Sequence, residues 1–113
     1  MAAVYVNNLV VNTGSTFQQT FNLESTDNNS ALDLSGYTVA SQMRKWAGAS
    51  TATDFTASIP EPTSGKIVIE LPAATTLSLR EGRYVYDILI TKGNVTERVV
   101  EGNVLVRAGV TRI

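Results

Sequence analysis

Residues 82–102 read GRYVYDILITKGNVTERVVEG, with a Gly-Asn pair between two runs that alternate apolar and polar residues. The first run, Arg83–Thr91, and the second, Val95–Val106, are rich in β-branched and aromatic residues, which favour strands. Gly93 and Asn94 both tolerate a positive φ, and tight hairpin turns require one. This stretch therefore predicts a β-hairpin with its turn at Gly93-Asn94.

Strand-type alternation recurs along most of the remaining chain, between clusters of Gly, Pro, Asn and Ser. The segments are Thr16–Glu24, Tyr37–Trp46, Phe55–Ile59 and Lys66–Leu71, and Val4–Val11 is a further Val-rich segment that Asn7-Asn8 interrupts. Residues 32–36 predict a turn that places two leucines in the core, and residues 72–80 predict one short helical turn. About seven short strands without a long helical period predict an all-β fold.

We expect one domain over residues 1–113, an immunoglobulin-like antiparallel β-sandwich, with residues 1–11 as an N-terminal arm or edge strand. The residues expected to form most of the core are Phe17, Phe21, Leu23, Val39, Met43, Ile67, Ile69, Leu71, Tyr84 and Ile88.

The composition excludes several classes of function. The net charge is −1 and the charges are scattered, so the basic stripe typical of nucleic-acid binding is missing. No apolar run approaches the roughly 20 residues that span a bilayer, and the first residues do not resemble a signal peptide. The chain has no Cys and no His, which removes disulfides, thiol nucleophiles and imidazole or thiolate metal sites. We therefore expect no enzyme activity, no cofactor, no nucleic-acid partner and no membrane partner.

The polar residues of the hairpin have mainly structural interpretations. Tyr84 or Tyr86 is expected to cap the preceding corner through its hydroxyl, as a tyrosine does in immunoglobulin-like sandwiches. Asp87 is expected to point outward and to bond to an Arg or Thr of a neighbouring strand, since an unpaired buried carboxylate is costly. Glu97 and Glu101 are expected to share one solvated face of the last strand.

Two further features have competing interpretations. The segment Asp27-Asn28-Asn29-Ser30 offers oxygen ligands for calcium, but it lacks a dense acidic pattern and favours a plain turn. Trp46, beside Arg44-Lys45, is expected to close one end of the core or to lie under a partner; stacking on a sugar is the alternative.

Four motifs resemble small β-sandwich proteins of tailed bacteriophages, including the N-terminal domain of baseplate upper proteins. They are Leu32–Tyr37 (x-D-L-[ST]-G-Y), Gln42–Arg44 (Q-[MI]-R), Leu79–Ile88 (L-x-x-G-x-Y-x-Y-D-[IL]) and Gly102–Arg112 (G-x-[VL]-x-V-x-x-x-V-T-R). The resemblance spans about Phe17 to Arg112. It implies a non-enzymatic virion structural protein, made in the host cytoplasm, that serves as a baseplate, tail or fibre-attachment adaptor.

The expected partners are other virion proteins and further copies of the chain in a homo-oligomer. The residues predicted to contact them are the apolar side chains of the first eleven residues and the tryptophan, namely Val4, Val6, Leu9, Val10, Val11 and Trp46. Two alternatives remain open: a capsid decoration protein, and a carbohydrate-binding module with an aromatic platform around Trp46 or Tyr37. A hydrolase would require two convergent carboxylates, and strand alternation offers no convincing pair.

Overall fold

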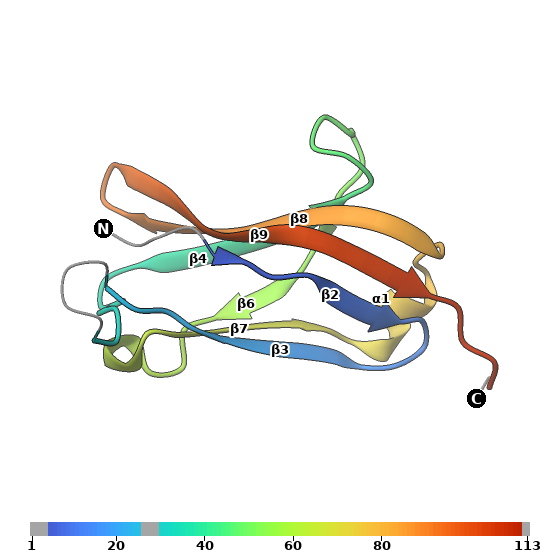
Figure 1. Ribbon diagram of the computed structural model, residues 1–113, viewed down its shortest axis with the longest axis horizontal. Coiled ribbons are helices and arrows are strands. Elements are labelled where there is room, and N and C mark those ends of the chain that lie inside the picture. Colours follow the sequence, from blue (N-terminus) through green and yellow to red (C-terminus); the bar gives the residue numbers. More distant parts are fainter. Residues whose placement is uncertain (1–4, 26–29, 112–113) are drawn as a thin grey trace.

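The structure is a computed structural model that describes residues 5–25 and 30–111 (Figure 1). Within these residues the strands form two facing sheets with the core between them. The six-stranded sheet runs in the order β1 (Tyr5–Val6), β9 (Val95–Arg107), β8 (Gly82–Lys92), β4 (Thr38–Arg44) and β5 (Thr53–Asp54), with β2 (Leu9–Asn12) also beside β9. The three-stranded sheet runs in the order β3 (Phe17–Asn22), β7 (Lys66–Leu71) and β6 (Thr56–Ser58). The predicted two-sheet, β-rich architecture is confirmed.

The hairpin of β8 and β9 forms as its sequence predicts. Lys92 pairs with Val95 across the turn, and Gly93 has a φ of 60°. The expected helical turn is also present as α1 (Ala73–Leu77), while η1 (Pro62–Ser64) is a short 3₁₀ turn before β7. Buried Thr76 of α1 donates a hydrogen bond to the carbonyl of Ser15 and accepts one from the amide of Gly14. α1 is thereby joined to the turn between β2 and β3.

The prediction of a fully antiparallel sandwich is wrong at the N-terminus. β1 and β2 both pair with β9 in parallel, so the six-stranded sheet is mixed. Asn7 and Asn8 separate the two short strands and still bind β9: the Asn7 amide donates to the carbonyl of Glu101, and the Asn8 Oδ1 accepts from the amide of Asn103. Gly102 permits this approach, since a Cβ there would lie 2.2 Å from the Asn7 carbonyl oxygen.

A β-bulge in β9 changes which residues share a face. Ile88 pairs with Val100 but Leu89 pairs with Arg98, so Val99 is an extra residue on β9. Facing residues of an antiparallel pair share a side of the sheet. Glu101, opposite Asp87, therefore lies on the side of the six-stranded sheet that is turned away from the core. Glu97 lies opposite Ile90, whose side chain is buried, and so takes the other side. The prediction that the two glutamates share one face is wrong.

The segment predicted as one strand over Phe55–Ile59 serves both sheets. It begins at Thr53: β5 pairs with β4, and β6 then pairs with β7. Between them the Phe55 amide donates to the carbonyl of Ser41, and the buried Phe55 ring packs 5.9 Å from that of Phe17 and 6.2 Å from that of Tyr86. An aromatic anchor therefore fixes the point where the chain changes sheet.

Most of the predicted core is confirmed. Val39 and Tyr84 are only partly buried and pack against the core, while the other eight predicted residues are buried. Of the two leucines in the predicted turn, Leu34 is buried and Leu32 is half-buried. Leu9 and Val11 of β2 also belong to the core, so residues 9–12 form an integral edge strand.

Candidate interaction surface

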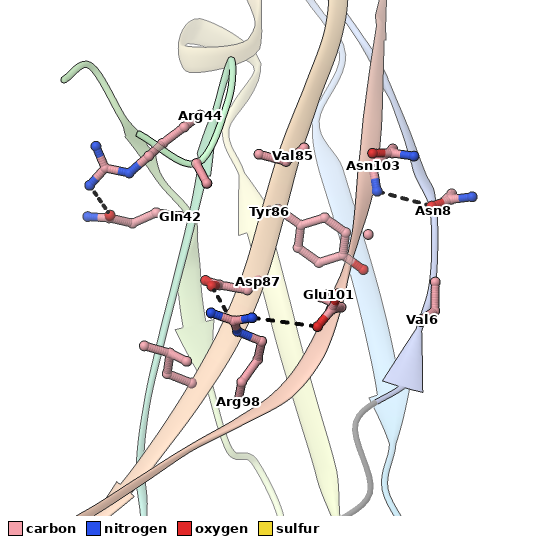
Figure 2. A pocket seen from close by; sticks show the side chains of 13 residues that line it. Val6, Asn8, Gln42, Arg44, Val85, Tyr86, Asp87, Arg98, Glu101 and Asn103 are labelled. Atoms are coloured by element: carbon pink, nitrogen blue, oxygen red, sulfur yellow. Dashed lines mark hydrogen bonds and ion pairs between the residues drawn. The ribbon is translucent and has the colours of Figure 1, made fainter. Parts of the chain in front are cut away.

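The side of the six-stranded sheet turned away from the three-stranded sheet carries a shallow hollow, and we call this side the outer face (Figure 2). It exists because alternate residues of β8 point away from the core: Val85, Asp87 and Leu89 are half-buried there, whereas the intervening Tyr86 and Ile88 are buried. The hollow encloses about 630 Å³ between β1 on one side and the end of β4 on the other. Its lining combines aliphatic Val85 and Leu89 with polar and charged side chains of β4, β8 and β9.

One charged cluster crosses the outer face. The Arg98 Nε lies 3.4 Å from Asp87 Oδ2, and its Nη1 lies 3.7 Å from Glu101 Oε1. Figure 2 shows the guanidinium between the two carboxylates. The predicted outward orientation of Asp87 and its bond to an arginine are confirmed. Because the side chains are 36–55% exposed, each pair contributes only about 0–1 kcal/mol.

A second polar cluster borders the hollow on β4. The Gln42 Nε2 donates to Asp54 Oδ1 at 2.5 Å, and the Gln42 Oε1 accepts from Arg44 Nη2 at 3.0 Å. Arg44 also donates from Nη1 to the carbonyl of Ala49 at 2.6 Å. These bonds fix Arg44 against the loop that follows β4, so this wall of the hollow has a defined shape.

Exposed apolar side chains adjoin the hollow on the other side. Val6 is 77% exposed, and Val10 and its register partner Leu105 are 50% and 41% exposed. The three residues come from β1, β2 and β9 and share the outer face. Such a group of apolar side chains beside a hollow is typical of a protein-binding surface.

The predicted contact residues fall into separate places. Leu9 and Val11 are 4% and 0% exposed and pack in the core, so their side chains are not available to a partner. Val6 and Val10 alternate with them and lie on the outer face, and Val4 lies outside the described residues. Leu105 was missed, although its place between two buried valines, Val104 and Val106, is a signal for an outward side chain.

Trp46 lies in the loop after β4 and is 62% exposed. The loop turns tightly, since the Ala49 amide donates to the carbonyl of Trp46 at 2.9 Å. An indole this exposed does not close the end of the core, so that interpretation is wrong. Trp46 is accessible to a partner or to a sugar.

Two tyrosines of β8 bond to backbone carbonyls. The Tyr84 hydroxyl donates to Arg80, four residues upstream, at 2.6 Å, which confirms the predicted corner. The Tyr86 hydroxyl donates to Asn7 at 2.6 Å and holds the N-terminal segment against the sheet. Burial raises the pKa of Tyr86 well above the ordinary value of 10.0.

Residues for metal chemistry do not gather in the described part of the chain, where no group of three or more Asp, Glu, His or Cys is placed to hold an ion. The Asp27 loop, considered above for calcium, falls outside the described residues at positions 27–29. Among the helices of residues 5–25 and 30–111, none has the length and apolar content for a membrane crossing.

No protein-family model matches the chain, and no curated protein matches it at a significant level. The fold is similar to part of the crystal structure of Listeria monocytogenes InlP, with a TM-score of 0.50 and 12% sequence identity. The match covers 89% of this chain and 26% of the InlP chain, so this chain spans about a quarter of that protein. At 12% identity the likeness shows the fold alone.

Proposed function

We propose that the chain is a non-enzymatic structural protein of a tailed-bacteriophage virion, an adaptor subunit in a baseplate, tail or fibre attachment. The virion assignment comes from the four sequence motifs. The observation that carries a binding role is the outer face, where Val6, Val10 and Leu105 are exposed beside a hollow of mixed apolar and polar lining. Asp87, Glu101 and Arg98 in the hollow are paired with one another, which favours contact with a neighbouring protein surface over capture of a charged ligand at this cluster.

The proposal includes an immunoglobulin-like assignment of the sandwich. In that fold one sheet contains strands B, E and D in order, and the other contains C, F and G. Taking β3, β7 and β6 as B, E and D, and β4, β8 and β9 as C, F and G, reproduces the order in both sheets. Tyr84 then takes the position of the tyrosine corner at the start of strand F. An experimental structure with β6 paired to β4 instead of β7 would contradict this assignment.

The virion role is tested by mass spectrometry of purified particles from the phage or prophage that encodes the chain. The binding role is tested in the same particles with Val10→Asp, which places a charge among the exposed apolar side chains without disturbing the core. We expect the variant to fold and to be lost from the particles. Val95→Asp is the matched control, because Val95 is a 59% exposed valine at the tip of the hairpin. Absence of the wild-type chain from particles contradicts the virion role, and normal incorporation of Val10→Asp contradicts the binding surface.

Carbohydrate binding is a second candidate because of the exposed indole of Trp46. If Trp46 stacks on a sugar, its fluorescence changes on titration with oligosaccharides, and Trp46→Ala removes the binding. A capsid decoration protein would use the same outer face, and labelling of the chain in intact particles distinguishes a position on the head from one on the tail.

A further inference from the structure

The edges of the two sheets are not equally protected against pairing with another chain. β5 has two residues and includes Asp54, β6 has three residues and is soon followed by Pro60, and the edge formed by β1 and β2 is interrupted at Asn7-Asn8. Short length, charge, proline and irregularity are the usual means by which edge strands avoid pairing. β3 has none of them, since its six residues, FQQTFN, are uncharged and pair without interruption with β7.

The direction of the hydrogen bonds shows which backbone groups β3 leaves at its open edge. The Leu23 amide donates to the carbonyl of Gly65, so Leu23 and alternate residues before it face β7. The amide of Glu24 faces the other way and donates to the Tyr5 hydroxyl at 3.1 Å. By the same alternation the groups of Gln18, Thr20 and Asn22 face the open edge.

Within the described residues, few hydrogen bonds engage the open edge of β3. Between Phe17 and Asn22 it carries a long hydrogen bond of 3.4 Å, which the Gln19 side-chain amide donates to the Thr20 carbonyl. Gln18 and Asn22 present their backbone groups at the surface, where their side chains are exposed as well. A strand that paired here would replace water and the weak Gln19 contact with regular ladder bonds.

The sequence of β3 is complementary to itself in one antiparallel register. If Thr20 lies on a two-fold axis, Thr20 faces Thr20 and Gln18 faces Asn22 of the second copy. All three residues whose backbone groups face the open edge then pair, with about six backbone hydrogen bonds in total. In this register odd-numbered residues face odd-numbered residues of the second copy. Phe17 and Phe21 therefore stay on the core side of the sheet in both copies.

The charged residues of β7 are compatible with the same register. Gln18 lies beside Glu70 and donates to its Oε1 at 2.7 Å, and Asn22 lies beside Lys66. In the two-fold arrangement each cross-strand row therefore runs from Glu70 through Gln18 to Asn22 and Lys66 of the second copy. Like charges therefore do not lie opposite one another across the new pair of strands. We propose that β3 pairs with β3 of a second copy of this chain, joining the two three-stranded sheets into one continuous sheet.

The proposal is tested by cross-linking, since the chain has no Cys and a single introduced thiol is unambiguous. Facing residues in a hydrogen-bonded antiparallel pair have Cα atoms about 5.5 Å apart, which suits a disulfide. Thr20→Cys is therefore expected to form a dimer under mild oxidation. Gln18→Cys tests the register, because the two thiols would lie about 14 Å apart and should not join. Thr56→Cys is the matched control, an exposed threonine opposite Glu70 on the other edge strand of the same sheet.

Sedimentation of the unmodified chain and of lysine variants provides an independent measurement. The wild type is expected to show a concentration-dependent dimer. Thr20→Lys, which puts two like charges face to face, is expected to raise its dissociation constant roughly tenfold or more. Thr56→Lys should leave the dimer unchanged, and circular dichroism checks that both variants fold. A wild-type chain that is monomeric at all concentrations, a dimer that survives Thr20→Lys, or equal cross-linking through Gln18→Cys would overturn the proposal. The assay uses the purified chain alone, so its result does not depend on a virion role.

Discussion

At the scale of single residues, two tyrosines on one strand have different tasks. Tyr84 bonds to Arg80 within its own corner, whereas Tyr86 bonds to Asn7, which is far away in sequence. Tyr86 is also buried and packs edge-on against Phe55. Its hydroxyl therefore connects the N-terminal segment with the aromatic cluster at the sheet crossing, and it must remain protonated to do so.

The protonation of Tyr86 predicts a loss of stability in alkali. Its pKa is raised in the folded state and is about 10 in the unfolded chain. Above about pH 10 the unfolded chain releases a proton that the folded chain retains, so the free energy of unfolding falls as the pH rises from there. Urea denaturation from pH 8 to 11 should show this decline, with a smaller decline in Tyr86→Phe.

The same variant has an expected cost at neutral pH. Tyr86→Phe leaves the Asn7 carbonyl without its donor, which should lower the stability by about 0.5–1.5 kcal/mol. Tyr37→Phe serves as the control, because it removes a tyrosine hydroxyl from a half-buried position and leaves the Tyr86 hydroxyl in place. Identical pH profiles for the wild type and Tyr86→Phe would show that this hydroxyl does not titrate as argued.

At the scale of elements, the hairpin of β8 and β9 is governed by its turn and by its bulge. The turn consists of two residues and joins strands of 11 and 13 residues. The bulge at Val99 allows the side chains of both Val99 and Val100 to be buried. Beyond the bulge the alternation of β9 is reversed. Arg98 and Glu101 consequently meet on the outer face beside Asp87.

The turn predicts a clear difference between two substitutions of Gly93. Nothing lies within 4 Å of a Cβ built there, so the cost of a side chain arises only from its φ of 60°. Gly93→Val should lower the free energy of unfolding by about 1–2 kcal/mol, because a β-branched residue resists this conformation. Gly93→Asn should cost much less, since Asn tolerates it. Thermal unfolding of the pair measures the difference, and equal melting temperatures would contradict the turn geometry.

At the scale of the whole molecule, the first two described strands lie beside the last one, β9. β2 and β9 are parallel neighbours, and β2 contributes Leu9 and Val11 to the core while Val10 points outward. Residues 9–12 are therefore not an N-terminal arm that could be deleted without loss of the fold. Forming this edge of the sheet requires the N-terminal segment to pair with the last strand, which is a long-range contact.

This arrangement predicts opposite outcomes for neighbouring residues of β2. Leu9→Ala should destabilise the domain by roughly 2–5 kcal/mol, because it removes a buried side chain from the core. Val10→Ala should change the stability by less than about 0.5 kcal/mol, because its side chain is half exposed on the outer face. Denaturant unfolding of both variants tests this, and a small effect of Leu9→Ala would show that β2 is not an integral strand.

Several features follow from the sequence by itself because they depend on near neighbours. The period-two alternation of residues 17–23 and 66–71 determines which side chains are buried, and the Gly-Asn pair determines the hairpin. The bond from the Tyr84 hydroxyl to the Arg80 carbonyl and the helical turn at 73–77 are likewise local, since the bonds that define them span only a few residues.

The remaining features were decided by the tertiary structure, because they depend on pairing between distant segments. The parallel alignment of β2 with β9 separates Leu9 and Val11 from Val6 and Val10, which the sequence alone had grouped as one contact surface. The bulge at Val99 is defined only by its register against β8, and it reverses the faces of Glu97 and Glu101. Local periodicity predicts that a strand has two faces, but the strand that pairs with it, and the register of that pair, determine which face meets the core.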